Sequence, residues 1–203
     1  MSDNALDNIA TLLTGIGIAP GGAVHQTDPT AFAVEAHGDQ KYAGQPYLYH
    51  LQKVERILDD HGFIGFTWTA AAKLHDVIED THLHLTPEQR LEMIKEKFGE
   101  DVAALVWAVS GIGPNRKARN EDIYRKLGEY PKACILKLAD RIANVEASIK
   151  DPATNAPNIP MARMYLKERH RFTEVVKPHT PSSMWGRLDL GFERLETLVT
   201  NAA

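Results

Sequence analysis

Residues 73–81 have the sequence KLHDVIEDT, which contains two pairs of ionisable side chains, His75–Asp76 and Glu79–Asp80. At about 100° per residue, a helix would project all four within an arc of roughly 140°. The surrounding positions are apolar and predict a buried helix: Trp68, Ala70, Ala71, Ala72, Leu74, Val77 and Ile78. Charges on one face of a buried helix are costly unless a partner there neutralises them. A divalent metal ion is the simplest such partner, because it binds imidazole nitrogen and carboxylate oxygen together.

The composition is that of one globular domain. With 203 residues and 43% hydrophobic content, the chain can bury one sizeable core. Its formal net charge of −4 gives no general attraction to nucleic acid or anionic membranes, so an anionic ligand needs a local basic cluster. The single cysteine, Cys134, excludes an intrachain disulfide and a thiolate zinc site, and is expected to be an inert buried thiol.

The expected location is the cytoplasm. No apolar run approaches the roughly 20 residues that span a bilayer. The start, MSDNALDN, lacks the basic head of a signal peptide. We therefore expect a soluble cytoplasmic protein whose partner is neither a membrane nor a nucleic acid.

The hydrophobic periodicity is helical almost throughout, and no segment alternates convincingly as a strand does. The fold class predicted is therefore all-α, a single-domain helical bundle. We divide it into an N-terminal extension (1–26), a helical core (27–150) and a C-terminal pair of helices packed on that core (151–203). Besides the helix that carries both ionisable pairs, helices are expected near 5–14, 29–40, 48–60, 87–98, 100–110, 131–150, 161–176 and 182–200.

Capping patterns place several helix starts. Asp28 followed by proline opens one helix, and Thr86 with Gln89 forms a capping box for another. We assign Thr67 as the cap of one continuous helix that carries both ionisable pairs. The segment GIGPNRKARNED (111–122) is polar and basic, and is interpreted as a loop.

Two further residues could complete a metal site. Asp140 lies in an apolar helical segment, where an unpaired carboxylate is costly, although it could pair with Arg141 or Arg56. His50 stands at the entry of an amphipathic helix, where a lone histidine is often structural. Together with His75 and Asp76, they form a set of two histidines and two aspartates, which suits manganese, iron or magnesium.

Four motifs occur in order and at compatible spacing: AFAVEAHGDQKYAGQPYLYH (31–50), AAKLHDVIEDT (71–81), KFGEDVAALV (97–106) and LKLADRIAN (136–144). In these motifs the chain resembles the HD-domain hydrolases of the RelA/SpoT alarmone family, particularly the small stand-alone alarmone hydrolases. The resemblance covers about residues 29–150, which would make the predicted core an HD hydrolase core.

The resemblance implies a helical HD fold that binds one manganese ion through His50, His75, Asp76 and Asp140. It also implies hydrolysis of the 3′-pyrophosphate of guanosine tetra- or pentaphosphate (ppGpp or pppGpp), which gives GDP or GTP and pyrophosphate. In that chemistry a metal lowers the pKa of water and polarises a phosphoryl oxygen. Glu79 and Asp80, one turn beyond the metal ligands, are expected to orient the water and pass protons. The alternative for this pair is the solvated end of a helix before Thr81.

The expected substrate-binding residues are Lys41, Asn144, Arg116, Lys117 and Arg163. Asn144 follows Asp140 by one helical turn, so its amide could hydrogen-bond a ligand. Arg116 and Lys117 belong to the most concentrated basic segment and could clamp phosphates, although a solvated basic loop is the alternative. Arg163 could close the pocket from the C-terminal side, or it could be an ordinary surface residue.

The chain departs from the family pattern where specificity would be set. Lys41 stands where the family usually has an arginine that would stack on a purine, and lysine does so less well. Ala143 and Glu146 stand where histidine and arginine are usual. These positions leave open another phosphorylated nucleotide as substrate, such as an adenosine alarmone (ppApp), a nucleoside monophosphate or a 2′/3′-phosphorylated dinucleotide. A module that senses nucleotides without turnover is the remaining alternative, and the oligomeric state is left open.

Overall fold

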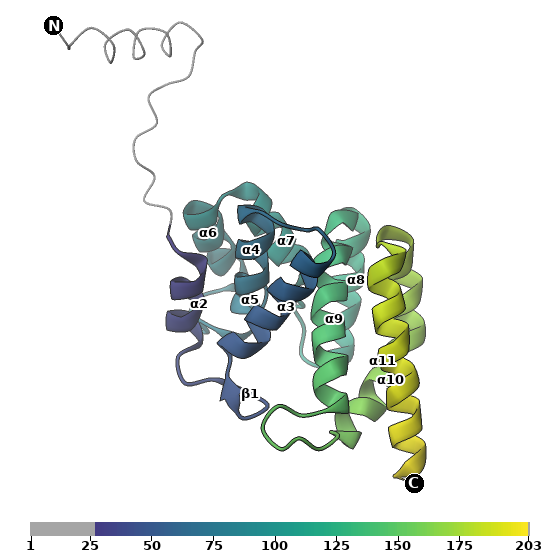
Figure 1. The fold of residues 1–203 in the computed structure, drawn as a ribbon. Coiled ribbons are helices and arrows are strands. Elements are labelled where there is room, and N and C mark those ends of the chain that lie inside the picture. The colour runs from purple at the N-terminus through teal and green to yellow at the C-terminus, as the bar shows by residue number, and fades with distance from the viewer. Residues whose placement is uncertain (1–26, 203) are drawn as a thin grey trace, which may run out of the picture.

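The computed structural model describes residues 27–202, which fold as a helical bundle with one small hairpin (Figure 1). The elements are α2 (Pro29–His37), β1 (Lys41–Tyr42), β2 (Gln45–Pro46), α3 (Leu48–Asp60), α4 (Phe66–Leu74), α5 (Val77–Asp80), α6 (Pro87–Phe98), α7 (Glu100–Val109), α8 (Arg116–Glu129), the 3-10 turn η1 (Pro131–Ala133), α9 (Cys134–Ile149), α10 (Ile159–Val176), η2 (Lys177–His179) and α11 (Ser182–Asn201). The predicted all-α class is confirmed. The predicted extension (1–26), with its helix at 5–14, lies outside the described residues.

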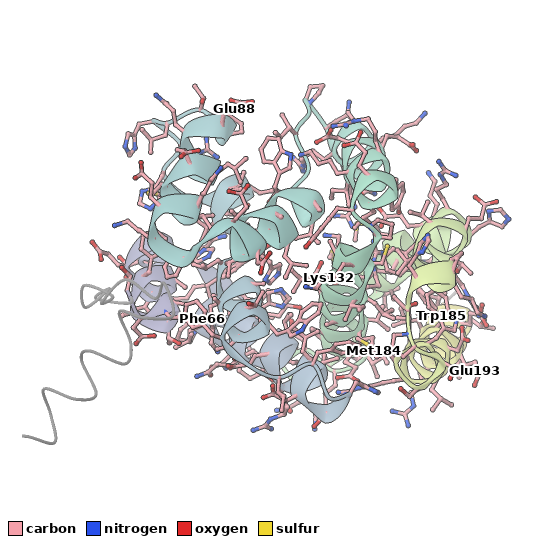
Figure 2. The ribbon with its side chains drawn as sticks, turned by 90° about the horizontal axis from the view of Figure 1, so that it is seen from above. Phe66, Glu88, Lys132, Met184, Trp185 and Glu193 are labelled. Atoms are coloured by element: carbon pink, nitrogen blue, oxygen red, sulfur yellow. The ribbon has the colours of Figure 1, made fainter. Side chains whose placement is uncertain are left out.

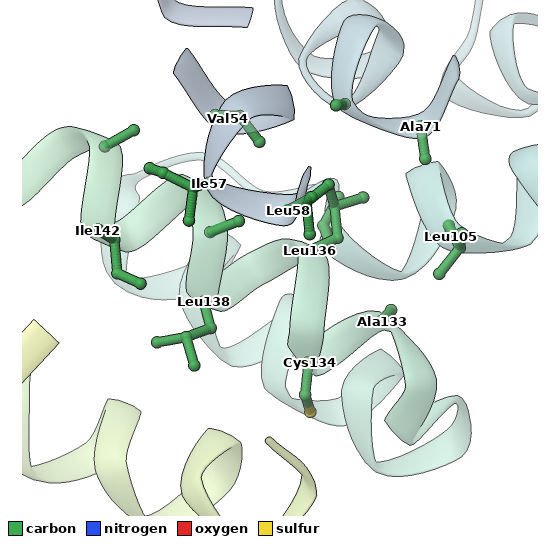
Figure 3. Close-up of a cluster of buried hydrophobic side chains, with 14 of the residues drawn as sticks. Val54, Ile57, Leu58, Ala71, Leu105, Ala133, Cys134, Leu136, Leu138 and Ile142 are labelled. Carbon is green, nitrogen blue, oxygen red and sulfur yellow. The ribbon is translucent and has the colours of Figure 1, made fainter. Parts of the chain in front are cut away.

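The central element is α9, which packs against α3 on one side and against α10 and α11 on the other (Figure 1). Its apolar side chains alternate between the two contacts. Figure 3 shows Leu136 beside Leu58 of α3, whereas Leu138 points toward the C-terminal helices. Cys134 is buried in the same core, and burial raises the pKa of its thiol to about 11, as expected for an inert cysteine. Because α9 carries a predicted site residue, this packing fixes one wall of the site.

The C-terminal helices share the core of the rest of the chain. Met184 and Trp185 face inward from α11 and are buried, whereas Glu193 points outward (Figure 2). Gly191 lies where α11 approaches α9 most tightly, because an added Cβ atom would lie 2.7 Å from a methyl group of Val145. The predicted single domain is thus confirmed, while the exact domain limits stay a prediction. Among residues 27–202, no helix is both long and apolar enough to cross a bilayer.

The helix predicted to carry both ionisable pairs is interrupted, which corrects the expectation of one continuous helix. α4 ends at Leu74, and the four-residue α5 begins at Val77, so the His75–Asp76 pair occupies the junction. The N-cap of α4 is Gly65, at φ 101°, and not Thr67. The Nδ1 atom of His75 donates to the carbonyl of Ala72 at 2.9 Å, which satisfies one of the free carbonyls at the end of α4.

Two further segments differ from the prediction. The segment 111–122 is only partly a loop, because the side chain of Asn115 accepts a hydrogen bond from Ala118 N at 3.0 Å and starts α8 at Arg116. Residues 41–46 form a short antiparallel hairpin that was not predicted. Its central residues Ala43 and Gly44 both have positive φ angles, as a tight hairpin turn requires. The other capping predictions hold, since Asp28 caps α2 and Thr86 forms its capping box with Gln89.

Candidate active site

A polar cavity of about 190 Å³ is lined by β1, α3, α5, α8, α9 and α10. Its acidic and basic lining side chains are Asp76, Glu79, Asp140, His50, Arg116, Arg119, Lys137 and Arg141. A larger surface hollow of about 630 Å³, beside α3, contains none of these residues. Because the smaller cavity gathers carboxylates, an imidazole and cations that the fold brings from distant segments, it is the candidate active site.

Two histidines and two aspartates meet beside this cavity: His50, Asp76 and Asp140 line it, and His75 is buried against them. His50 lies in the first turn of α3, His75 and Asp76 lie at the α4–α5 junction, and Asp140 lies in the middle of α9. The His50 Nε2 atom lies 3.3 Å from both His75 Nε2 and Asp140 Oδ1. The His75 Nε2 atom lies 3.1 Å from Asp76 Oδ2 and 3.8 Å from Asp140 Oδ1. The fold therefore brings together the four residues that the sequence nominated as metal ligands.

The orientation of His75 follows from its backbone contact. A carbonyl oxygen can only accept a hydrogen bond, so the Nδ1 atom that contacts Ala72 carries the proton. In the neutral ring, the Nε2 atom then presents a lone pair to the cluster. A histidine that ligates a metal commonly donates its other ring N–H to a carbonyl in this way. The helix break at His75 is thus part of how the chain positions this ring.

Asp140 is held by its own helix. Its Oδ2 atom lies 3.0 Å from Lys137 Nζ, and its Oδ1 atom accepts a hydrogen bond from the Asn144 amide. Burial opposes ionisation, but Lys137 and the two histidines outweigh burial and hold the pKa of Asp140 well below its usual range. Asp140 therefore pairs with Lys137, and not with Arg141 or Arg56, the two partners that the sequence left open.

The charge balance of the cluster fits a divalent metal ion. Burial opposes a charge on His75, but Asp76 and Asp140 outweigh burial and raise the pKa of the imidazole well above its ordinary value. The cluster thus favours an added positive charge, which a proton or a metal cation can supply. Ligand atoms of His50, His75 and Asp76 lie within 4.8 Å of one another, and Asp140 Oδ1 lies 3.3 and 3.8 Å from the two imidazoles. These nitrogen and oxygen donors, with no cysteine among them, suit a divalent metal.

Glu79 lies inside the cavity. Its Oε1 atom accepts a hydrogen bond from Gly111 N at 2.7 Å, which connects α5 to the loop after α7. Burial raises the pKa of Glu79 and the Asp76 carboxylate adds to this, although Lys137 acts in the opposite direction. Glu79 therefore keeps its proton to a higher pH than an ordinary glutamate does.

Asp80 lies at the exposed edge of the cluster and is held by two side chains. Gln40 Nε2 donates to Asp80 Oδ2 at 3.0 Å. The hydroxyl of Tyr47 lies 2.6 Å from Asp76 Oδ2 and 3.2 Å from Asp80 Oδ2, so one proton serves both carboxylates. His37 supports this arrangement, because its ring stacks on Tyr47 at 4.2 Å and hydrogen-bonds Gln40 at 2.8 Å.

The fold divides the five residues nominated for substrate binding. Arg116 and Asn144 line the cavity. Lys41, Lys117 and Arg163 are exposed and are not among its lining residues. The Asn144 amide is already engaged, because its oxygen accepts from Tyr42 at 2.8 Å while its nitrogen donates to Asp140. In this geometry Asn144 supports Asp140 instead of presenting a free amide to a ligand.

Sequence reasoning missed several residues of the cavity. Lys137 precedes Asp140 by three residues, and Tyr47 precedes His50 by three, so helical spacing could have placed both beside the cluster. Glu168, in contrast, contacts the cavity arginine Arg116 from 52 positions away in sequence. No local pattern predicts that contact.

The HD-domain profile matches residues 30–160. The chain belongs to the HD-domain family. A guanosine-3′,5′-bis(diphosphate) 3′-pyrophosphohydrolase of Aquifex aeolicus is 42% identical over 121 residues, which make up 57% of this chain and 16% of that protein. A probable enzyme of the same name from Synechocystis is 31% identical over 123 residues, or 56% of this chain and 15% of the relative.

Similarity to a solved structure extends over more of the fold. A metazoan ortholog of SpoT, described as hydrolyzing ppGpp, superposes with a TM-score of 0.68 and covers 87% of this chain and 97% of its own. The sequence identity is 22%, so this similarity establishes the fold alone. The chain spans only a small part of the curated relatives that it matches.

Proposed function

We propose that this protein hydrolyses the 3′-pyrophosphate of guanosine tetra- or pentaphosphate, which yields GDP or GTP and pyrophosphate. The single observation that carries the proposal is the meeting of His50, His75, Asp76 and Asp140 at a cavity that also contains a protonatable glutamate and several cations. The proteins of Aquifex and Synechocystis whose names give this reaction align with 57% and 56% of this chain. A cytoplasmic location stays a prediction.

The proposed cofactor is one Mn²⁺ ion held by His50, His75, Asp76 and Asp140. When bound, a divalent metal supplies Lewis acidity that lowers the pKa of water and polarises a phosphoryl oxygen. Tyr47 holds Asp76, and Lys137 with Asn144 holds Asp140, so the carboxylate oxygens are oriented before a ligand arrives.

Glu79 and Asp80 are proposed to transfer the protons that hydrolysis requires. Water must lose a proton as it attacks phosphorus, and the ribose 3′-oxygen must gain one as the bond to phosphorus breaks. Asp80, fixed by Gln40 and Tyr47 at the edge of the cluster, is assigned to the proton of the attacking water. Glu79, whose pKa burial raises inside the cavity, is assigned to proton delivery.

The cations of the cavity are suited to the phosphate groups. Arg116 and Arg119 enter it from α8, and Lys137 and Arg141 enter from α9. They gather positive charge in a chain whose formal net charge is −4. Guanidinium groups bind phosphate oxygens through pairs of hydrogen bonds, and this geometry favours a diphosphate over an uncharged substrate.

The test is a product-resolved assay of purified protein with Mn²⁺ and ppGpp, with ppApp in a parallel reaction. The proposal predicts release of pyrophosphate and GDP from ppGpp, and loss of that release when EDTA is added. Turnover confined to ppApp would keep the mechanism and change the base specificity. Tight binding of both nucleotides without any turnover would instead support a sensing module and contradict the proposed enzyme.

A further inference from the structure

The carboxylate of Glu168, on α10, accepts hydrogen bonds from three side chains of two other helices. Its oxygens lie 2.6 Å from Arg116 Nε and 3.1 Å from Arg116 Nη2, an arrangement that uses one edge of the guanidinium. The same carboxylate lies 2.8 Å from Arg141 Nη1 and 3.1 Å from Asn120 Nδ2. Glu168 therefore joins α8 to α9 at the point where both helices line the cavity.

The two arginines keep capacity for a second anion. One carboxylate faces two guanidinium groups, so Glu168, Arg116 and Arg141 together retain a net positive charge. Each guanidinium has five N–H donors. Glu168 uses two donors of Arg116 and one of Arg141, and both side chains line the cavity, so each guanidinium keeps N–H donors that Glu168 does not occupy.

Aromatic rings of α10 fix the position of the guanidinium groups further. The Arg141 guanidinium lies 4.7 Å from the ring centre of Tyr165 and 4.6 Å from that of Phe172. The Arg116 guanidinium lies 5.7 Å from the Tyr165 ring. Both guanidinium groups are thus ordered before a phosphate binds. Binding would therefore cost less side-chain conformational entropy than if the two arginines were free.

We propose that Glu168 is a positioning residue that orients Arg116 and Arg141 toward the diphosphate of the substrate, so that α10 completes the anion-binding side of the cavity. The identity of the anion rests on the proposed function, whereas the arrangement of the two arginines does not. Arg116 and Arg141 hold the pKa of Glu168 down to about 2, so the carboxylate stays charged throughout the neutral range.

The decisive variant is Glu168→Gln, which keeps the size of the side chain and removes its charge. We expect the KM for ppGpp to rise about tenfold, the effect of roughly one charge-assisted hydrogen bond, while kcat changes much less. The matched control is Glu174→Gln, on the same helix, which removes an exposed ion pair with Arg171. It should leave both constants unchanged.

Two outcomes would overturn the inference. An unchanged KM in Glu168→Gln would show that the carboxylate only joins helices. A lower KM would show that it competes with substrate for the arginines. Glu168→Asp, which keeps the charge on a shorter side chain, should give an intermediate KM, and thermal melts of all variants separate these effects from loss of folding.

Calorimetric titration with inorganic pyrophosphate separates the inference from the proposed function. We expect weaker binding to Glu168→Gln than to the wild type and to Glu174→Gln. If the wild type hydrolyses no ppGpp but this order of affinities holds, the proposed function fails and the positioning role stands. Equal affinities in the three proteins, or no binding to any of them, overturn the positioning role even where ppGpp is hydrolysed.

Discussion

Asp80 is exposed, and its side-chain partners Gln40 and Tyr47 both come from the segment before α3. Its side chain therefore contributes little to the core and much to the geometry of the cluster. We predict that Asp80→Asn folds as the wild type does and loses at least about 100-fold in kcat, the usual range for loss of a proton-transfer group. Melting curves measure the stability of the variant, and steady-state pyrophosphate release measures its kcat. Full residual activity in a folded variant would remove Asp80 from the mechanism.

Tyr47 is the side chain that connects Asp80, one of the two proposed catalytic residues, to Asp76 of the proposed metal cluster. Its hydroxyl donates to Asp76 at 2.6 Å, so Tyr47→Phe leaves that carboxylate without its fixed donor. We expect the affinity for Mn²⁺ to fall about 10- to 100-fold, as is typical when a partner of a metal ligand is removed. Isothermal titration measures this. Tyr124→Phe, a buried tyrosine outside the cavity, is the control and should bind Mn²⁺ normally, and equal affinities in both variants would contradict this role of Tyr47.

At the same scale, without the family motifs the site was most predictable where a residue conflicts with its own surroundings. His75, Asp76 and Asp140 stand out because a charge in an apolar helical segment needs a partner. Glu168 stands in a polar, strongly charged segment, where a glutamate conflicts with nothing. Its role arises from the packing of α10 against α8 and α9, which the local sequence does not encode.

At the scale of single elements, the errors at helix ends have one physical cause, which is that side-chain hydrogen bonds to nearby backbone groups decide where a helix breaks or begins. The sequence 67–80 favours helix throughout, yet His75 closes α4 through its contact with Ala72. The segment 111–122 is polar enough to be a loop, but Asn115 caps a helix there. Because successive helical residues point about 100° apart, Arg116 lines the cavity and Lys117 does not.

The junction of α8, α9 and α10 should respond to acid. The arginines hold the folded-state pKa of Glu168 at about 2, below its ordinary value of 4.5. A carboxylate whose pKa is lower in the folded state than in the unfolded state stabilises the fold at pH values above its unfolded-state pKa. This contribution is lost as the pH falls toward the folded-state pKa. We therefore predict that the stability difference between wild type and Glu168→Gln, on the order of 2 kcal/mol near pH 6, shrinks between pH 4.5 and 2. Urea unfolding across this range measures it, and a difference that does not depend on pH would contradict the assignment.

At the scale of the whole molecule, the sequence predicted the fold class and a C-terminal pair of helices packed on the core, but not how closely α11 approaches α9. Gly191 permits the close approach of α11 to α9, since an added Cβ atom would lie 2.7 Å from Val145. We predict that Gly191→Ala destabilises the protein by about 1–3 kcal/mol through overpacking and lowers Tm by several degrees. Gly186→Ala, on the same helix with open space around it, should be neutral or slightly stabilising. Equal melting temperatures in the two variants would contradict this packing.

We propose that the cluster of His50, His75, Asp76 and Asp140 binds one metal ion and that this ion is required for the hydrolysis of ppGpp. The most direct test is a titration of EDTA-treated, dialysed protein with Mn²⁺ while pyrophosphate release from ppGpp is recorded. We predict that activity rises in proportion to added Mn²⁺ and saturates at about one ion per chain, and that Asp140→Ala shows neither tight binding nor activity. Full turnover by the metal-free protein, or stoichiometric Mn²⁺ binding with no release of pyrophosphate, would contradict the account.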